Sequence, residues 1–118
     1  MGACVLVADD SREFADMLRA TLEEAGFEVA TAYSGPAAVA ALRDNDVDVA
    51  VLDVLMPGLS GDAVAEHVQR THPELPILLM TGDAGHAFVG AAGLPVLHKP
   101  FRHEELVDEV KKLLRLPA

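Results

Sequence analysis

Short apolar runs alternate with longer segments of helical period along the chain, and this alternation limits the possible folds more than any other feature. The runs are mostly apolar throughout, which is typical of strands that are covered on both faces. Strands and helices that alternate in this way predict an α/β protein with a parallel sheet, helices on both sides and right-handed crossovers. The five expected strands are CVLVA, EVATA, VDVAVLD, PILLMT and PVLH, at residues 4–8, 28–32, 47–53, 76–81 and 95–98.

The segments between these runs carry signals for helix ends. Ser11 and Ser34 are predicted N-caps, since each hydroxyl side chain directly precedes a segment of helical period. Gly26 is expected to end the first helix, because glycine readily adopts the backbone conformation found just after a helix. Two more helices are expected over about 62–72 and 102–114. The last of these is expected to bury Leu106, Val110, Leu113 and Leu114.

Composition predicts one globular domain over residues 1–118, with 51% hydrophobic and 24% charged residues and no linker or repeat. The net charge of −10 argues against direct contact with nucleic acid or an anionic membrane, because both need a basic surface. Cys4 is the single cysteine and is expected to be a small buried side chain rather than half of a disulfide. No signal peptide or bilayer-spanning run is visible, so we expect a cytoplasmic protein without membrane insertion.

Polar side chains stand where the expected strands end. The first strand runs into Asp9 and Asp10, the third ends in Asp53, the fourth ends in Thr81, and the fifth runs into Lys99. The carboxyl ends of parallel strands share one edge of the sheet, which is where open α/β sheets bind their ligands. We therefore expect these five side chains to lie in one cleft.

The chemistry of this group points to phosphoryl transfer. Three neighbouring carboxylates are hard to ionise together unless a cation joins them, and oxygen ligands without His or Cys favour Mg²⁺. Lys99 and Thr81 could pair with and donate to a bound anion, while Asp53 could supply the nucleophile. Taken singly, an Asp-Asp pair before a helix is more often a simple cap, and a Lys before Pro is usually a solvated loop residue.

The chain resembles the receiver domain of two-component response regulators, the fold of the chemotaxis protein CheY. The resemblance rests on VLVADDS, VLDVLMPGLSG, ILLMTGD and HKPF, which occur in this order along the chain. It implies a flavodoxin-like, doubly wound (βα)5 sandwich whose five-stranded parallel sheet has the order 2-1-3-4-5. It leaves open whether the chain is a stand-alone receiver or the receiver of a hybrid histidine kinase.

The resemblance also assigns roles to the residues at the strand ends. It implies that Asp53 is the phosphoacceptor and that Asp9, Asp10, Asp53 and the backbone carbonyl of Leu55 hold Mg²⁺. Asp10 matches the direct metal ligand, and Asp9 matches an acid that acts more through water.

Two further residues complete the implied site. Thr81 matches the switch hydroxyl that follows the phosphoryl group, and Lys99 matches the family's lysine, whose bond to Pro100 is cis in receivers. The implied function is Mg²⁺-dependent transfer from a histidine kinase or histidine phosphotransfer domain onto Asp53, followed by slow self-hydrolysis. Such a domain is a switch rather than an enzyme, and it changes the surface around the fourth and fifth strands and helices that a downstream effector reads.

The segment after the fourth strand departs from the family pattern. Val96 stands where receivers usually carry the aromatic residue that moves with the switch hydroxyl, and Phe88 is a candidate replacement. Only seventeen residues separate Thr81 from Lys99, about one helical turn fewer than is usual. The glycine-flanked stretch at 83–93 permits at most a short fourth helix, so we hypothesise that output runs through ordering or shifting of this stretch.

Three other functions would place different demands on the same residues. An aspartyl-phosphate phosphatase would want a second acid two residues after the nucleophile, where this chain has Leu55. A flavodoxin-like electron carrier would want a Ser/Thr/Gly-rich phosphate loop after the first strand, where this chain has DDSRE. A degenerate receiver that docks partners without phosphorylation remains the alternative, and the complete set of acids, hydroxyl and lysine argues against it.

Overall fold

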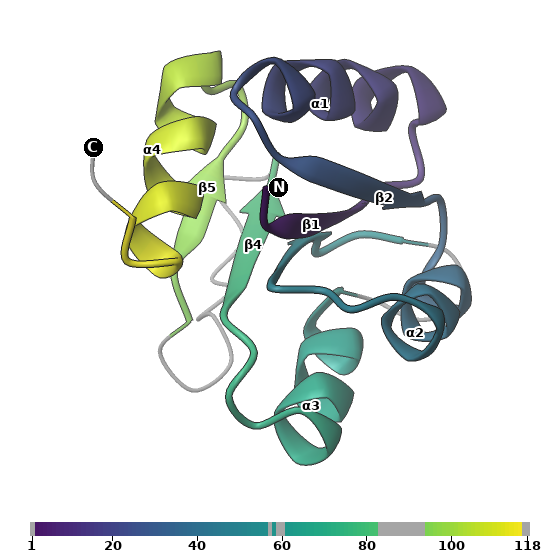
Figure 1. The fold of residues 1–118 in the computed structure, drawn as a ribbon. Coiled ribbons are helices and arrows are strands. Elements are labelled where there is room, and N and C mark those ends of the chain that lie inside the picture. The colour runs from purple at the N-terminus through teal and green to yellow at the C-terminus, as the bar shows by residue number, and fades with distance from the viewer. Residues whose placement is uncertain (1, 57, 59–60, 83–93, 117–118) are drawn as a thin grey trace.

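Five parallel strands form one sheet in the order β2-β1-β3-β4-β5 (Figure 1). The computed structural model describes residues 2–56, 58, 61–82 and 94–116. The strands are β1 Cys4–Ala8, β2 Glu28–Ala32, β3 Val49–Asp53, β4 Ile77–Thr81 and β5 Val96–His98. The helices are α1 Arg12–Glu24, α2 Gly35–Asp44, α3 Gly61–Thr71 and α4 His103–Leu113.

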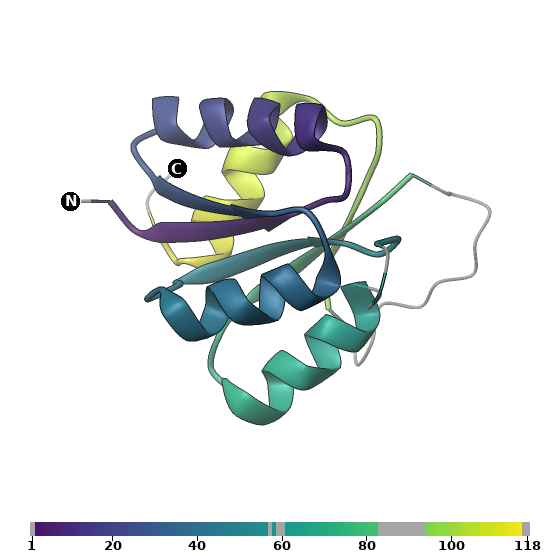
Figure 2. The same cartoon turned by 90° about the vertical axis from the view of Figure 1, so that its right-hand side faces the viewer.

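Helices cover both faces of the sheet. α1 and α4 lie side by side on one face, and α2 and α3 lie together on the other (Figures 1 and 2). The predicted doubly wound α/β fold and the strand order implied by the resemblance are both confirmed. The short fourth helix expected between β4 and β5 falls at 83–93, outside the described residues, so the last expected helix carries the label α4.

The strands are apolar throughout because their side chains enter two cores in turn. In β3, Val49 and Val51 pack with α1 and α4, whereas Ala50 and Leu52 pack with α2 and α3. Every residue of β3 is buried, and so is every residue of β4. This period of two explains why the sequence shows continuous apolar runs instead of an apolar and polar alternation.

The predicted helix ends are confirmed by backbone geometry. The Ser11 hydroxyl oxygen accepts a hydrogen bond from the N–H of Phe14 at 3.2 Å, and Ser34 caps Ala37 in the same way at 3.2 Å. Gly26 follows α1 with φ of +100°, in the left-handed region where a side chain would be strained. These caps set where α1 and α2 begin and hence how the chain leaves β1 and β2.

Two predictions about burial were wrong. Leu106 and Val110 of α4 are buried, but Leu113 and Leu114 are only half-buried, because they pack at the rim of the core where the helix ends. Cys4 is also only half-buried, since it is the first residue of β1 and lies outside the covered middle of the sheet. Partial burial, followed by the charge of Asp48, raises the pKa of the Cys4 thiol.

The helices of the described part of the chain are short and amphipathic. None of them is long and apolar enough to cross a bilayer.

Candidate functional site

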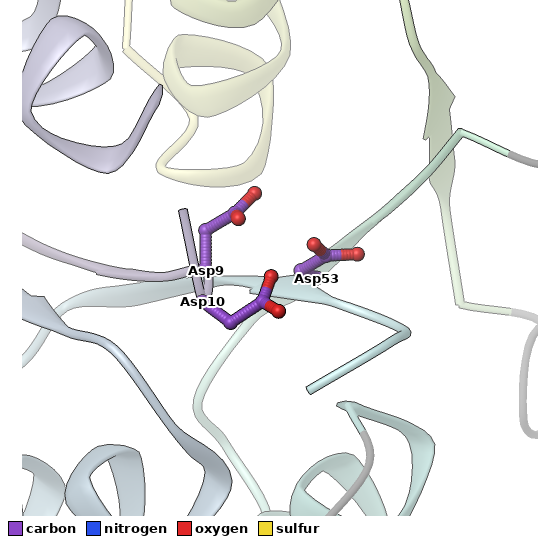
Figure 3. A group of neighbouring side chains, drawn as sticks. All are labelled: Asp9, Asp10 and Asp53. Carbon is purple, nitrogen blue, oxygen red and sulfur yellow. The ribbon is translucent and has the colours of Figure 1, made fainter. Parts of the chain in front are cut away.

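Three carboxyl groups gather at the carboxyl ends of β1 and β3 (Figure 3). Asp9 and Asp10 directly follow β1, and Asp53 is the last residue of β3. One carboxylate oxygen from each lies within 4.8 Å of the others. Asp9 and Asp53 are 1% and 6% exposed, whereas Asp10 is exposed to solvent. The expected acidic cluster is therefore present, with two buried members and one accessible member.

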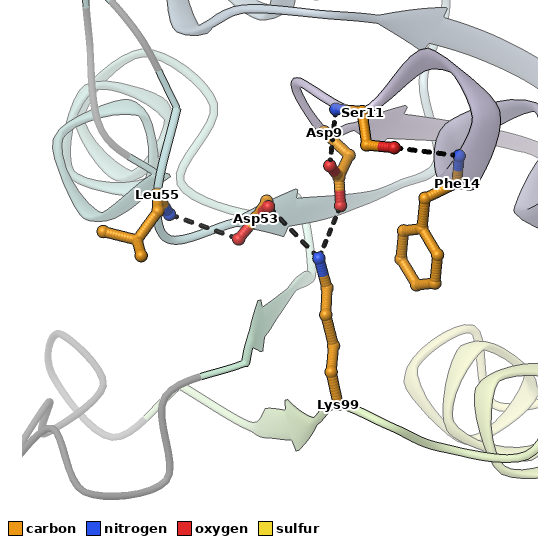
Figure 4. A network of polar contacts seen from close by, with 6 residues as sticks. All are labelled: Asp9, Ser11, Phe14, Asp53, Leu55 and Lys99. Carbon is orange, nitrogen blue, oxygen red and sulfur yellow. Dashed lines mark hydrogen bonds and ion pairs between the residues drawn. The ribbon is translucent and has the colours of Figure 1, made fainter.

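Lys99 joins this cluster from the end of β5. Its Nζ donates to Asp9 Oδ2 at 2.8 Å and to Asp53 Oδ2 at 3.2 Å, so the ammonium reaches acids of two strands that are not neighbours of β5 (Figure 4). The alternation of side chains explains the meeting. Val51 and Leu97 both pack in the core under α1 and α4. Asp53 and Lys99 each stand two residues further along, so their side chains point to the same face of the sheet. The Lys99–Pro100 peptide bond is cis, as the resemblance implied.

Backbone N–H groups hold the other oxygens of the two buried acids. Asp9 Oδ1 accepts from the N–H of Ser11 at 2.9 Å, and Asp53 Oδ1 accepts from the N–H of Leu55 at 3.2 Å. Within the described residues, no hydrogen bond or ion pair reaches the carboxylate of Asp10. Asp9 and Asp53 are thus fixed in orientation, while Asp10 can turn toward a ligand.

Negative charge is in excess at the site. Burial, followed by the nearby Asp9 carboxylate, raises the pKa of Asp53 to about 6, although Lys99 and the Leu55 N–H act in the opposite direction. Burial alone would lower the pKa of Lys99, but its hydrogen bond to Asp9 and the charge of Asp53 outweigh this, so the pKa lies above its usual value. The ammonium is therefore charged at neutral pH and neutralises only part of the cluster.

The donor set suits a hard divalent cation. Its ligands are carboxylate oxygens alone, and Mg²⁺ prefers one or two carboxylates together with several waters. The exposed Asp10 leaves one side of the cluster open to water, and the raised pKa of Asp53 reflects a demand for positive charge. The residues fit Mg²⁺ on these grounds. The contribution expected from the Leu55 carbonyl stays a prediction; the Leu55 residue itself is 59% exposed beside the site.

Thr81 occupies the expected strand end. It is the last residue of β4 and is 3% exposed, and its backbone carbonyl accepts from the N–H of Lys99 at 2.8 Å. At the next residue, Gly82, an added Cβ would make only an ordinary contact at 3.8 Å from Lys99 Cδ, so the position of the lysine stem does not require glycine there. Val96 is half-buried on β5 and pairs with Leu79, so an aliphatic side chain does occupy the position of the usual aromatic.

The switching hypothesis for residues 83–93, including Phe88, lies outside the described residues. It stays a hypothesis.

Sequence reasoning missed two contributors to the site. Ser11 was expected only to cap α1, yet its backbone N–H also orients Asp9. Phe14 was not assigned to the site from the sequence, yet Lys99 Nζ lies 4.3 Å from the centroid of its ring. A signal for both existed, because these residues occupy the first turn directly after the acidic pair and so must stand at the same edge of the sheet.

Comparison of the sequence with known families matches residues 5–111 to the response regulator receiver domain. A probable transcriptional regulatory protein, TcrX of Mycobacterium tuberculosis, is 40% identical over 115 residues, which cover 94% of this chain and 49% of that protein. The response regulator MprA of a Mycobacterium species (strain KMS) is 36% identical, covering 94% of this chain and 50% of its own. The chain thus spans about half the length of the curated relatives it matches.

Solved structures agree with this match. The receiver domain of the Francisella response regulator 1452 superposes with a TM-score of 0.87 at 27% identity, covering 97% of this chain and 98% of its own. The response regulator TrrA of Thermotoga maritima, solved in complex with Mg²⁺ and BeF, superposes with a TM-score of 0.87 at 30% identity, covering 94% of this chain and 98% of its own.

Proposed function

Because this chain belongs to the response regulator receiver domain family of two-component systems, we propose that it accepts a phosphoryl group on Asp53 and works as a phosphorylation switch. The observation that carries the proposal is the Lys99 ammonium, which bridges the buried carboxylates of Asp9 and Asp53 at 2.8 and 3.2 Å. An ordinary surface lysine extends its ammonium into solvent. The placement of Lys99 between two buried acids is instead expected of a lysine that also pairs with an incoming phosphoryl group.

Asp53 acts as the nucleophile in this proposal. One of its carboxylate oxygens forms a bond to phosphorus while the bond from phosphorus to the donor's imidazole nitrogen breaks, and the imidazole leaves with the electron pair of that bond. Each Asp53 oxygen accepts a hydrogen bond from one described group, Leu55 N–H or Lys99 Nζ, so each retains a lone pair for attack. With a pKa of about 6, the carboxylate is mostly ionised at neutral pH and thus able to attack.

The groups around Asp53 orient its carboxylate and compensate negative charge. The Leu55 N–H fixes the plane of the Asp53 carboxylate. The Lys99 ammonium has three N–H donors, so it can donate one hydrogen bond to a phosphoryl oxygen while it keeps its contacts with Asp9 and Asp53. Asp9, Asp10, Asp53 and the proposed Leu55 carbonyl would hold Mg²⁺, which would supply the remaining positive charge against the transferred group. Thr81 is proposed to donate a hydrogen bond from its hydroxyl to the phosphoryl group, so that phosphorylation changes the end of β4.

The partners in this proposal are those that the family implies. A histidine kinase or a histidine phosphotransfer domain is the donor, and a downstream effector reads the altered surface around β4, β5 and α4. We propose that residues 1–118 form one receiver domain that works in the cytoplasm. Its net charge of −10 leaves any nucleic-acid contact to an effector.

The test is the intact mass of the protein after incubation with acetyl phosphate, with and without Mg²⁺. Wild type is expected to gain one phosphoryl group only when Mg²⁺ is present, and Asp53→Asn is expected to gain none. Asp108→Asn is a matched control, because Asp108 is an exposed aspartate on α4, and it should behave as wild type.

Absence of an adduct under all conditions, including rapid quenching, together with no binding of beryllofluoride, would refute the switch. It would leave a docking module with a receiver fold.

A further inference from the structure

The Lys99 ammonium has a third neighbour besides its two carboxylates, namely the face of Phe14. Nζ lies 4.3 Å from the ring centroid. At this separation a cation is attracted by the negative charge over the face of an aromatic ring. The Lys99 side chain is 24% exposed, so the contact is partly shielded from water. Shielding strengthens the attraction between a cation and a ring.

Phe14 makes two further contacts, one through its backbone and one through its ring. Its N–H donates to the Ser11 hydroxyl in the first turn of α1. Its ring meets the ring of Phe101 in an edge-on arrangement, with centroids 5.9 Å apart and planes at 72°. Phe101 follows Lys99 by only two residues, so the aromatic pair connects α1 to the same chain segment that carries the lysine. The backbone cap fixes where Phe14 stands on α1, and the contact with Phe101 orients its ring beside Lys99.

Figure 4 shows the hydrogen bonds that connect Phe14, Ser11, Asp9 and Lys99, and the contact between the Phe14 ring and Lys99 Nζ joins the two ends of this series. Asp9 Oδ1 accepts from the Ser11 N–H, and the Ser11 hydroxyl oxygen accepts from the Phe14 N–H. The Phe14 ring faces Lys99 Nζ, which donates back to Asp9 Oδ2. The carboxylates fix the ammonium from the sheet edge, and the ring fixes it from the α1 side. A lysine side chain has a flexible four-carbon stem, so a second side of contact restricts it strongly.

We propose that Phe14 is a positioning residue for Lys99. The Phe14 ring holds the Lys99 ammonium against Asp53 and thereby speeds phosphoryl acceptance. The rate effect rests on the proposed function, because it requires that Asp53 accept a phosphoryl group. The positioning effect does not. A lysine that is already in place when the phosphoryl donor arrives has less freedom to lose on the way to the transition state.

A purely structural role for Phe14 is the competing explanation, since the ring also packs against the core under α1 and α4. The two roles require different properties of the side chain at position 14. Core packing needs only volume and apolar surface, which leucine largely retains. Positioning of an ammonium needs the negative face of the aromatic ring.

The first arm of the test is NMR of metal-free, unphosphorylated protein with labelled lysine. The chain has three lysines, so Lys111 and Lys112 on α4 serve as internal references for Lys99. We expect the ε-methylene protons of Lys99 to be shifted upfield by the Phe14 ring current. The shift should vanish in Phe14→Leu and persist in Phe14→Tyr, which keeps the ring. An unchanged shift in Phe14→Leu would overturn the proposal.

The second arm is the rate of phosphorylation by acetyl phosphate at saturating Mg²⁺. Phe14→Leu is expected to react about 3- to 10-fold more slowly, the range that one cation–ring contact carries, and Phe14→Tyr to recover most of the rate. Phe27→Leu is the matched control, because Phe27 is 7% exposed in the same core and should leave the rate unchanged. A Phe14→Leu rate equal to that of wild type would also overturn the proposal.

Two complications have their own readouts. If Phe14→Leu fails to fold, mono-, di- and trifluorinated phenylalanine at position 14 weaken the ring face in steps at nearly constant shape. The rate should then fall in the same steps, and a flat series would refute the positioning role. If wild type accepts no phosphoryl group, the proposed function fails, and the Lys99 proton shift still decides whether Phe14 positions the lysine.

Discussion

Replacing Asp53 with asparagine should stabilise the metal-free protein at neutral pH, although the substitution destroys the proposed phosphoacceptor. Asp53 is 6% exposed and lies beside the Asp9 carboxylate, and these surroundings raise its pKa from 3.8 to about 6. The ionised carboxylate is thus less favourable in the folded protein than in the unfolded chain. Asparagine is similar in shape to the protonated acid and carries no charge.

The expected size follows from the rise in the pKa of Asp53 from 3.8 to about 6. Converted to free energy, a shift of roughly two units sets an upper limit of roughly 3 kcal/mol. The pKa of Lys99 is raised by the same contacts, so part of the gain is lost when its partner is removed. We therefore expect a net stabilisation of roughly 1–3 kcal/mol.

The sign of the pH dependence is fixed by which state holds the proton. Below pH of about 4, Asp53 is protonated in both the folded and the unfolded state, so its charge costs nothing. Between about pH 4 and 6 the unfolded chain loses the proton first, and the free energy of unfolding of wild type therefore falls relative to that of Asp53→Asn. Above pH of about 7 the difference between the two proteins should be constant.

Urea unfolding of both proteins in EDTA, from pH 4 to 8, measures this difference directly. Titrating groups away from Asp53 act alike in the two proteins and cancel. Asp108→Asn is the control and should stay close to wild type at every pH, because Asp108 is exposed and surface substitutions change stability little. A difference for Asp53→Asn that does not change with pH, or a less stable variant at pH 7.5, would refute the argument that burial and Asp9 penalise the Asp53 charge.

Three further outcomes are expected. Mg²⁺ at a hundred times its dissociation constant should stabilise wild type by roughly 3 kcal/mol in urea unfolding. Equal stabilisation of Asp10→Asn would exclude Asp10 as a ligand. Ser11→Ala should lower the free energy of unfolding by roughly 1 kcal/mol through loss of the α1 cap, and an unchanged free energy would show that water replaces the cap. Leu55→Asn should hydrolyse the aspartyl phosphate several-fold faster, because an amide beside Asp53 can hydrogen-bond the attacking water; a quench-flow rate equal to that of wild type would place residue 55 away from the phosphoryl group.

Local rules sufficed for most of the secondary structure of the described residues, although the expected strands at 47–53, 76–81 and 95–98 begin one or two residues before β3, β4 and β5. The expected strands at 4–8 and 28–32 match β1 and β2 to the residue, and the caps Ser11 and Ser34 make the expected hydrogen bonds. These features depend on neighbours along the chain, such as a hydroxyl three residues before a free N–H, so a linear reading captures them. Burial at element ends was predicted less well, as Cys4 shows, because it depends on what covers the end.

The strand order was not contained in the periodicity. Apolar runs predict a covered parallel sheet, but many orders would bury them equally, and 2-1-3-4-5 entered through the resemblance of four motifs to a family.

For the site, the sequence by itself determined which side chains reach the carboxyl edge of the sheet. Asp9, Asp10, Asp53, Thr81 and Lys99 each stand at or just after the end of an apolar run, and any parallel sheet would bring those ends to one edge.

Only the tertiary structure decided how these groups meet. Lys99 bridges Asp9 and Asp53 although both belong to strands beyond its neighbour, and it does so under the ring of Phe14 from α1. Those contacts join residues up to ninety positions apart. Their geometry depends on strand register, on the face to which each side chain points and on the packing of α1, and none of these can be read from the neighbours of a residue in sequence.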